Sequence, residues 1–140
     1  MASPRAPDPG CVFCGIVAGR SPAYRVYEDA DTVAFLDLYP FTRGHLLVVP
    51  RGHAPRLTDY PDADQAALVR TLARMCARVE RLAPDYNVAM NAGAAAGQIV
   101  FHVHFHVIPR YGEPNPFHPG QRHRIQEREA MEIVARLSPE

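Results

Sequence analysis

The spacing of apolar and polar positions along the chain predicts several short strands and one long helix. Apolar residues recur every three or four positions from Asp62 to Leu82, which is typical of an amphipathic helix. Short runs with strand character, bounded by turn residues, cover residues 24–27, 32–37, 45–50, 86–91 and 99–109. The first three runs follow one another without an intervening helix, which indicates an antiparallel meander. The order of elements therefore predicts an α+β fold.

The two ends of the chain are expected to be less regular. Residues 1–10 are rich in Pro, Ala and Asp, a composition typical of a disordered leader. Residues 11–19 form a short apolar segment, which predicts one or two helical turns. From about residue 111 the chain is rich in proline and is expected to be irregular, with a short terminal helix over 126–137. No repeat or linker divides residues 11–140, so a single domain is expected.

Composition and charge narrow the class of protein. Fifteen basic residues balance 15 acidic residues, and this formal net charge of +0 argues against partners such as nucleic acid or an acidic membrane. All the basic residues are Arg, so lysine Schiff-base chemistry is excluded. No apolar run is long enough to span a bilayer, and the N-terminus lacks the layout of a signal peptide. A cytoplasmic location is therefore expected.

The last predicted strand carries three histidines on alternate positions, His102, His104 and His106, with apolar residues between them. In a strand, side chains two positions apart share a face and lie about 7 Å from one another. The three imidazoles are therefore expected on one face and the apolar side chains on the other. Packing alone explains a lone buried histidine but not three in register, so this row predicts a function.

Two kinds of chemistry suit such a row of neutral imidazoles, namely metal binding and catalysis at phosphorus. A row spread over about 14 Å cannot converge on a single ion, because Zn–N bonds are only about 2 Å long. We therefore expect one end of the row to bind a metal and the middle histidine to perform the chemistry.

The N-terminal segment supplies a candidate metal site. Cys11 and Cys14 form a C-x-x-C pair, which suits zinc or redox work. With His53 and His102 they would make the closed two-Cys, two-His set of a structural zinc site. Two alternatives remain open from the residues alone, a redox-active pair and two ordinary buried thiols.

The stretch from Gly97 to Pro109, GQIVFHVHFHVIP, resembles the histidine triad signature of the HIT superfamily. The C-x-x-C pair makes the chain most similar to the bacterial zinc-containing members. The resemblance runs from about Cys11 to Arg110. It implies an antiparallel sheet of about five strands with one long helix and a short N-terminal helix. It also implies a homodimer in which the long helices and the strands over 86–91 of two chains meet.

The resemblance implies a two-step reaction at phosphorus. His104 would attack the α-phosphorus of a nucleoside phosphoramidate or dinucleoside polyphosphate, and water would then release a nucleoside monophosphate from the nucleotidyl-histidine. A backbone carbonyl is expected to hold the other nitrogen of that ring. His106 would contact the phosphate, and His45 would orient the triad from behind. Gln98 would bind the leaving group or a phosphate oxygen. Arg110 could also approach a polyphosphate.

The resemblance further implies a purine nucleotide or nucleotide conjugate as partner. Asp37 resembles a ribose-binding carboxylate and Asn91 a polar position beside the phosphates. From the residues alone, a solvated acid remains the alternative for Asp37 and a turn residue the alternative for Asn91. The apolar residues expected around the nucleoside and phosphates are Phe13, Phe35, Leu36, Leu38, Ile99 and Val100. Ile99 stands where many phosphoramidate-cleaving relatives carry Ser or Thr, which removes a hydroxyl that could assist the leaving group.

Two other classes of function remain open. A nucleotide-binding regulatory or scaffold protein would turn over substrate only incidentally, which the intact His104 argues against. A structural zinc protein without a nucleotide role would leave Gln98 and Asp37 unexplained.

Overall fold

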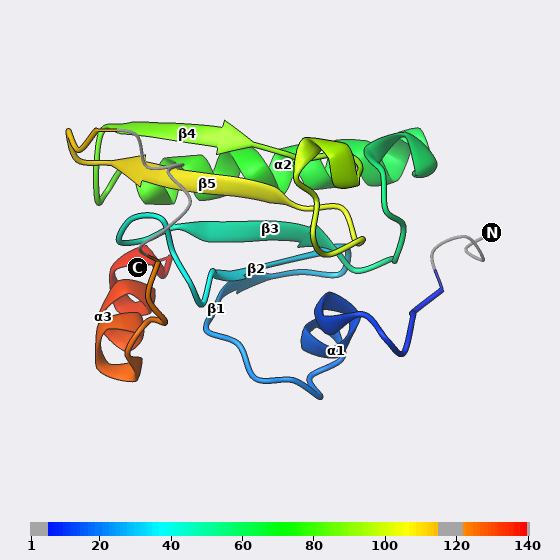
Figure 1. Ribbon diagram of the computed structural model, residues 1–140, viewed down its shortest axis with the longest axis horizontal. Coiled ribbons are helices and arrows are strands. Elements are labelled where there is room, and N and C mark those ends of the chain that lie inside the picture. Colours follow the sequence, from blue (N-terminus) through cyan, green and yellow to red (C-terminus); the bar gives the residue numbers. More distant parts are fainter. Residues whose placement is uncertain (1–5, 115–121, 140) are drawn as a thin grey trace.

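Five strands form one antiparallel sheet in the computed structural model, which describes residues 6–114 and 122–139. The strands are β1 (Arg25–Glu28), β2 (Thr32–Leu36), β3 (Leu46–Pro50), β4 (Asp85–Ala89) and β5 (Phe105–Arg110). Their order across the sheet is β1-β2-β3-β5-β4, and every neighbouring pair is antiparallel. The predicted meander is therefore present as β1 to β3, and β4 lies at an edge (Figure 1).

Three α-helices complete the described part of the chain, α1 (Val12–Val17), α2 (Asp62–Val79) and α3 (Glu127–Leu137). Two short 3₁₀ turns, η2 (Leu57–Asp59) and η3 (Ala94–Ala96), lie in the connections. The long helix α2 runs along one face of the sheet, while α1 lies on the other side, near β1 and β2 (Figure 1). Acidic residues in the first turn of α2 and Arg78 in its last turn complement the helix dipole.

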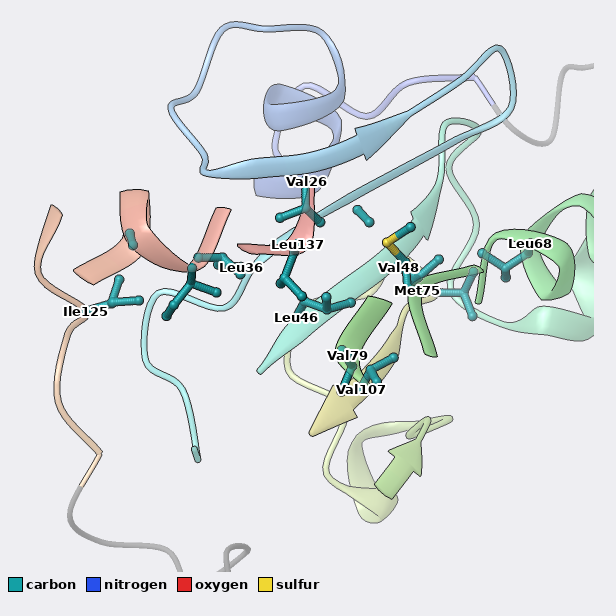
Figure 2. Packing of buried hydrophobic residues seen from close by; sticks show 14 of the residues in the cluster. Val26, Leu36, Leu46, Val48, Leu68, Met75, Val79, Val107, Ile125 and Leu137 are labelled. Carbon is teal, nitrogen blue, oxygen red and sulfur yellow. The ribbon is translucent and has the colours of Figure 1, made fainter. Parts of the chain in front are cut away.

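The side chains of β2 and β3 alternate between the two faces of the sheet, and each face has its own apolar cluster. The face covered by α2 is formed by Leu36, Leu46, Val48 and Val107, packed on Leu68, Met75 and Val79 of the helix (Figure 2). The opposite face is formed by Val33, Phe35, Leu47 and Val49, packed on Phe13 and Ile16 of α1. Because both faces are covered, β2 and β3 are buried along their whole length, which explains their nearly continuous apolar sequence.

The last strand is shorter than predicted. It begins at Phe105 instead of residue 99, and it pairs with β3 only from Leu46 to Val48. The reason lies in the partner strand, which ends at Pro50, where the ring removes the backbone donor that a longer ladder would need. The backbone N–H of Val103 donates to the carbonyl of Ala54 in a loop at 2.9 Å. The histidines at 102 and 104 therefore precede the strand.

The two ends of the described chain contain local structure. Asp8 belongs to a turn, since its carboxylate accepts from the N–H of Gly10 at 2.8 Å and its carbonyl accepts from Cys11 at 3.0 Å. The terminal helix α3 begins one residue after its expected start. Most of the proline-rich segment lies outside the described residues. Among the helices of the described residues, none combines the length and the hydropathy needed to cross a membrane.

Candidate active site and candidate metal centre

A cavity of about 740 Å³ opens on the α1 side of the sheet. Its walls come from α1, from β2 and the turn after it, from the loop before β5, and from β5 itself. Most of the lining is apolar. The polar groups that reach it include His104, His106, Asp37, Asn91 and Arg122. A mostly apolar cavity with a few converging polar groups is typical of a small-molecule site.

The ring of His104 is oriented by a backbone carbonyl. Its Nδ1 lies 2.8 Å from the carbonyl oxygen of His102, so Nδ1 carries the proton and donates it there. The edge of the Phe13 ring packs at 5.0 Å between ring centres. Burial lowers the pKa of His104, although the backbone bond and the charge of Asp37 oppose this shift. The neutral ring therefore keeps a lone pair on Nε2.

A chain of hydrogen bonds gives His106 the opposite tautomer. The N–H of Phe41 donates to Nδ1 of His45 at 3.0 Å, so the proton of His45 is on Nε2. That Nε2 lies 2.9 Å from Nδ1 of His106 and donates to it. The remaining proton of the neutral His106 ring is therefore on its Nε2, which is a donor. The ring centres of His104 and His106 are 5.0 Å apart, so a ring with a lone pair on Nε2 neighbours a ring with an N–H on Nε2.

Burial keeps the imidazoles of these hydrogen-bonded histidines neutral. Burial, together with repulsion from His104 and Arg122, lowers the pKa of His106 to about 4. Burial also holds the pKa of His45 well below its usual value, with the same kind of repulsion from His106 and Arg122. Near pH 7 these rings act as hydrogen-bonding groups and not as cations. Oδ2 of Asp37 lies 3.5 Å from Nε2 of His45.

Four side chains meet in a second cluster, beside the start of α1. Cys11 Sγ lies 3.6 Å from Nδ1 of His102, and Cys14 Sγ lies 3.6 Å from that nitrogen and 3.4 Å from Nδ1 of His53. The two Nδ1 atoms are 3.3 Å apart. A tetrahedron with Zn–S bonds of about 2.3 Å and Zn–N bonds of about 2.05 Å has edges of about 3.6 Å between S and N and about 3.3 Å between N and N. The four donors therefore fit a tetrahedral metal ion.

Neighbouring groups hold both histidines of this cluster with Nδ1 toward the thiols. Nε2 of His102 donates to the carbonyl of Pro50 at 2.8 Å, and Oδ2 of Asp8 lies 3.7 Å from Nε2 of His53. Burial lowers the pKa of His102 to about 4, so its ring is neutral, the form that binds metal. This group could hold a metal ion through atoms that all lie within 4.8 Å of one another.

The family model of the HIT domain matches residues 18–113 of the sequence. The chain belongs to the HIT domain family. It is 52% identical over 102 residues to an uncharacterised HIT-like protein of Mycobacterium tuberculosis, a match that covers 71% of this chain and 70% of the relative. It is 38% identical over 109 residues to the adenosine 5′-monophosphoramidase of Candida albicans, which covers 74% and 72% of the two chains.

A solved HIT structure agrees with the fold. The zinc-bound histidine triad protein of Mycobacterium smegmatis superposes with a TM-score of 0.75 at 40% identity, and the match covers 91% of this chain and 93% of that one. The expected α+β fold, with a five-stranded antiparallel sheet and one long helix, is confirmed as a HIT fold.

The HIT cavity brings together most of the residues singled out in the sequence. All those expected around the nucleotide line it, namely Phe13, Phe35, Leu36, Asp37, Leu38, Asn91, Ile99 and Val100. Ile99 is 84% exposed at the cavity wall, far more than a core residue would be. Asp37 and Asn91 are therefore cavity residues in this HIT domain.

Gln98 of this HIT domain lies elsewhere than expected. Its Oε1 accepts from the N–H of Gly93 at 2.8 Å, and its Nε2 donates to the carbonyls of Pro55 and Val100 at 3.0 and 3.1 Å. The side chain is buried and does not belong to the cavity wall. Both ends of the side-chain amide therefore bind backbone groups, in the loop before β5 and at Pro55. Gln98 stabilises this loop and is not placed to bind a leaving group.

Arg110 does not reach the cavity, whereas Arg122, which the sequence pattern did not single out, does. Arg110 donates to Glu113 and to Oδ1 of Asn87, both at 2.8 Å, and does not line the cavity. Arg122 does line it, although it follows the proline-rich segment. No spacing pattern could have found Arg122, because its contact with Tyr39 spans 83 positions of the chain. His123, next to it, is exposed, and His118 lies outside the described residues.

Proposed function

We propose that this HIT protein is a nucleotide hydrolase or nucleotidyltransferase that acts at the α-phosphate of nucleoside phosphoramidates or dinucleoside polyphosphates. The observation that carries the proposal is the pair of opposite tautomers in one cavity. His104 has a lone pair on Nε2, whereas His106 has an N–H on its own Nε2, and the two ring centres are 5.0 Å apart. A nucleophile beside a hydrogen-bond donor is the arrangement that phosphoryl transfer needs.

The first step forms a bond between Nε2 of His104 and the α-phosphorus while the bond from phosphorus to the leaving group breaks. The leaving group departs with that electron pair and takes a proton from water. The N–H of His106 stabilises the charge on the phosphoryl oxygens. His104 becomes a cationic nucleotidyl-imidazole, which the carbonyl of His102 and the charge of Asp37 stabilise.

The second step returns the enzyme to its starting state. Water attacks the phosphorus, the bond to Nε2 of His104 breaks with its electron pair returning to that nitrogen, and a nucleoside monophosphate leaves while the proton lost by the water passes to solvent. His104 keeps its Nδ1 proton on the carbonyl of His102 throughout, so the same nitrogen is ready for the next cycle. The Candida albicans relative, named an adenosine 5′-monophosphoramidase, supports a reaction of this type.

The nucleoside would occupy the apolar part of the cavity. Oδ1 of Asp37 accepts from the N–H of Tyr39 at 2.8 Å, which leaves Oδ2 for the ribose hydroxyls. Phe13 and Phe35, which meet edge to face at 5.5 Å, form a rigid apolar wall for a purine base. Asn91 would lie beside the phosphates.

We also propose that Cys11, Cys14, His53 and His102 hold one structural zinc ion. The donor distances and the zinc-bound relative from Mycobacterium smegmatis support this proposal. The metal would tie α1 to the loop after β3 and to the residue that orients His104. It takes part in no step of the reaction.

A homodimer is proposed through the edge strand β4 and the outer face of α2. Val88 on β4 is 44% exposed and Val69 on α2 is 50% exposed, so this edge presents apolar side chains. A second copy would cover them and extend the sheet.

The test of the catalytic proposal is the mass of the intact protein after brief mixing with an adenosine phosphoramidate or a diadenosine polyphosphate. We expect an added mass of one adenylyl group, mapped to His104, and no turnover in His104→Ala. His123→Ala, which changes an exposed histidine, is the control and should react normally. Turnover that survives in His104→Ala would defeat the assignment of the nucleophile. Tight AMP binding without turnover of either substrate would favour a regulatory role.

A further inference from the structure

Arg122 brings a positive charge to the cavity from a segment outside the histidine triad. Its Nε donates to the carbonyl oxygen of Tyr39 at 2.8 Å, and its guanidinium carbon lies 3.9 Å from the centre of the Phe41 ring. Its Nη2 lies 3.8 Å from Oδ2 of Asp37. The guanidinium is therefore held by a backbone acceptor, an aromatic face and a carboxylate.

The imidazoles of His106 and of His45 behind it supply no positive charge near pH 7. Burial lowers the pKa of His106 to about 4, and burial also keeps His45 behind it neutral by lowering its pKa. Asp37 is negative when ionised. Among the described residues that line the cavity, Arg122 is the only Arg, and the chain contains no Lys.

A nucleotide brings negative charge into this mostly apolar space. Neutral imidazoles can donate hydrogen bonds to a phosphate but cannot balance its charge, and the carboxylate of Asp37 repels it. A guanidinium offers both a full positive charge and paired donors that match phosphate oxygens. The side chain of Arg122 is 35% exposed, so its end can shift within the cavity.

We propose that Arg122 is a substrate-binding residue that recognises the charged phosphate of the nucleotide. Asp37 holds the guanidinium at the cavity until the ribose takes over the carboxylate and frees the guanidinium for the phosphate. This inference rests on the proposed function, because both require a nucleotide in the same cavity. It assigns the preference for a charged 5′-phosphate to the C-terminal segment and not to the triad.

The test compares the binding of AMP and of adenosine by calorimetry. Arg122→Gln should weaken the binding of AMP about 10- to 100-fold, the range for a lost hydrogen bond between charged groups. The same change should weaken the binding of adenosine less than about threefold. Arg122→Lys should recover part of the AMP affinity. Arg124→Gln is the matched control, since Arg124 follows in the same segment, 6.0 Å from the Tyr39 ring, and does not line the cavity.

The outcomes separate binding of phosphate from support of the cavity wall. If Arg122→Gln lowers the affinity for AMP and for adenosine equally, Arg122 only holds Tyr39 and Phe41 in place. That result overturns the inference. Unchanged AMP affinity also overturns it. Added salt should weaken AMP binding more in the wild type than in Arg122→Gln. If the wild type binds neither molecule, the proposed function fails as well, whereas failure of the variant comparison alone leaves that function standing.

Discussion

Nε2 of His45 lies 2.9 Å from Nδ1 of His106, and this contact decides which nitrogen of His106 carries its proton. The amide of Phe41 sets the tautomer of His45, and the Phe41 ring stacks on that imidazole at 5.4 Å with an angle of 15°. The backbone amide of Phe41 therefore determines that His106 faces the cavity as a donor, by way of His45, which does not line the cavity.

Replacing His45 by Phe should keep the stacking and remove the hydrogen bond. His106 could then present either nitrogen, so the donor to the phosphoryl oxygens is no longer guaranteed. We expect kcat to fall about 10- to 100-fold, while the affinity for AMP changes less. Steady-state kinetics and calorimetry check this split. Equal losses of kcat and of AMP affinity would instead indicate a general collapse of the site.

Replacing Cys14 by Ser should remove a metal ligand. Elemental analysis should give one zinc ion per wild-type chain and much less in Cys14→Ser, with a Tm lower by more than about 5 °C. Chelation of the wild type should lower its Tm before it affects turnover. The control is Cys76→Ser, since Cys76 is partly buried against the main core and is not a member of the cluster. Equal zinc content in Cys14→Ser and the wild type contradicts the zinc proposal but not the catalytic one.

Asp37→Asn should weaken the binding of adenosine about tenfold while stabilising the fold at neutral pH. Burial raises the pKa of Asp37, although the N–H of Tyr39 and the charge of Arg122 oppose this shift. Because the folded pKa is raised, ionisation costs stability above that pKa, and the cost disappears as the pH falls through it. The Tm advantage of Asp37→Asn should therefore be present at pH 7 and shrink at acid pH. Thermal scans across pH measure it, and an advantage that grows at acid pH is the wrong sign.

Asp29 should stabilise the turn between β1 and β2 in a pH-dependent way. Burial alone would raise the pKa of Asp29, but hydrogen bonds from Tyr27, Asp31 and Thr32 together lower it to about 2. This stability is present above the ordinary carboxyl pKa and is lost as the pH falls through about 2. Because the group is largely solvated, Asp29→Asn should cost on the order of 1 kcal/mol at pH 7.

Denaturant unfolding of Asp29→Asn and wild type at pH 7 and pH 2 checks this expectation. The gap between them should narrow at the lower pH. Asp31→Asn is the control. Only the backbone N–H of Asp31 binds Asp29, and its exposed carboxylate takes no part in these hydrogen bonds. A gap of the same size at both pH values would mean that the charge of Asp29 is not what stabilises the turn.

The local pattern of the chain was enough to predict much of the fold. The periodicity from Asp62 predicted α2, and the apolar runs predicted β2 and β3, because the spacing of buried residues follows directly from helix and strand geometry. The alternation around the triad predicted the faces of its side chains, since Val103 and Val107 do lie in the core on the α2 side. C-x-x-C spacing and the triad signature likewise predicted which residues meet in the two clusters.

Tertiary structure decided the features that depend on contacts between distant segments. The triad strand begins only at Phe105 because its partner ends at Pro50. The side chain of Gln98 binds Gly93 and Val100 in its own loop and the carbonyl of Pro55, 43 positions before it. Arg122 reaches Tyr39 from 83 positions away. The tautomer of His106 depends on a hydrogen bond to His45, 61 positions before it. Spacing reports the periodic burial of neighbouring residues, whereas hydrogen bonds and charges between remote segments exist only after the chain has folded.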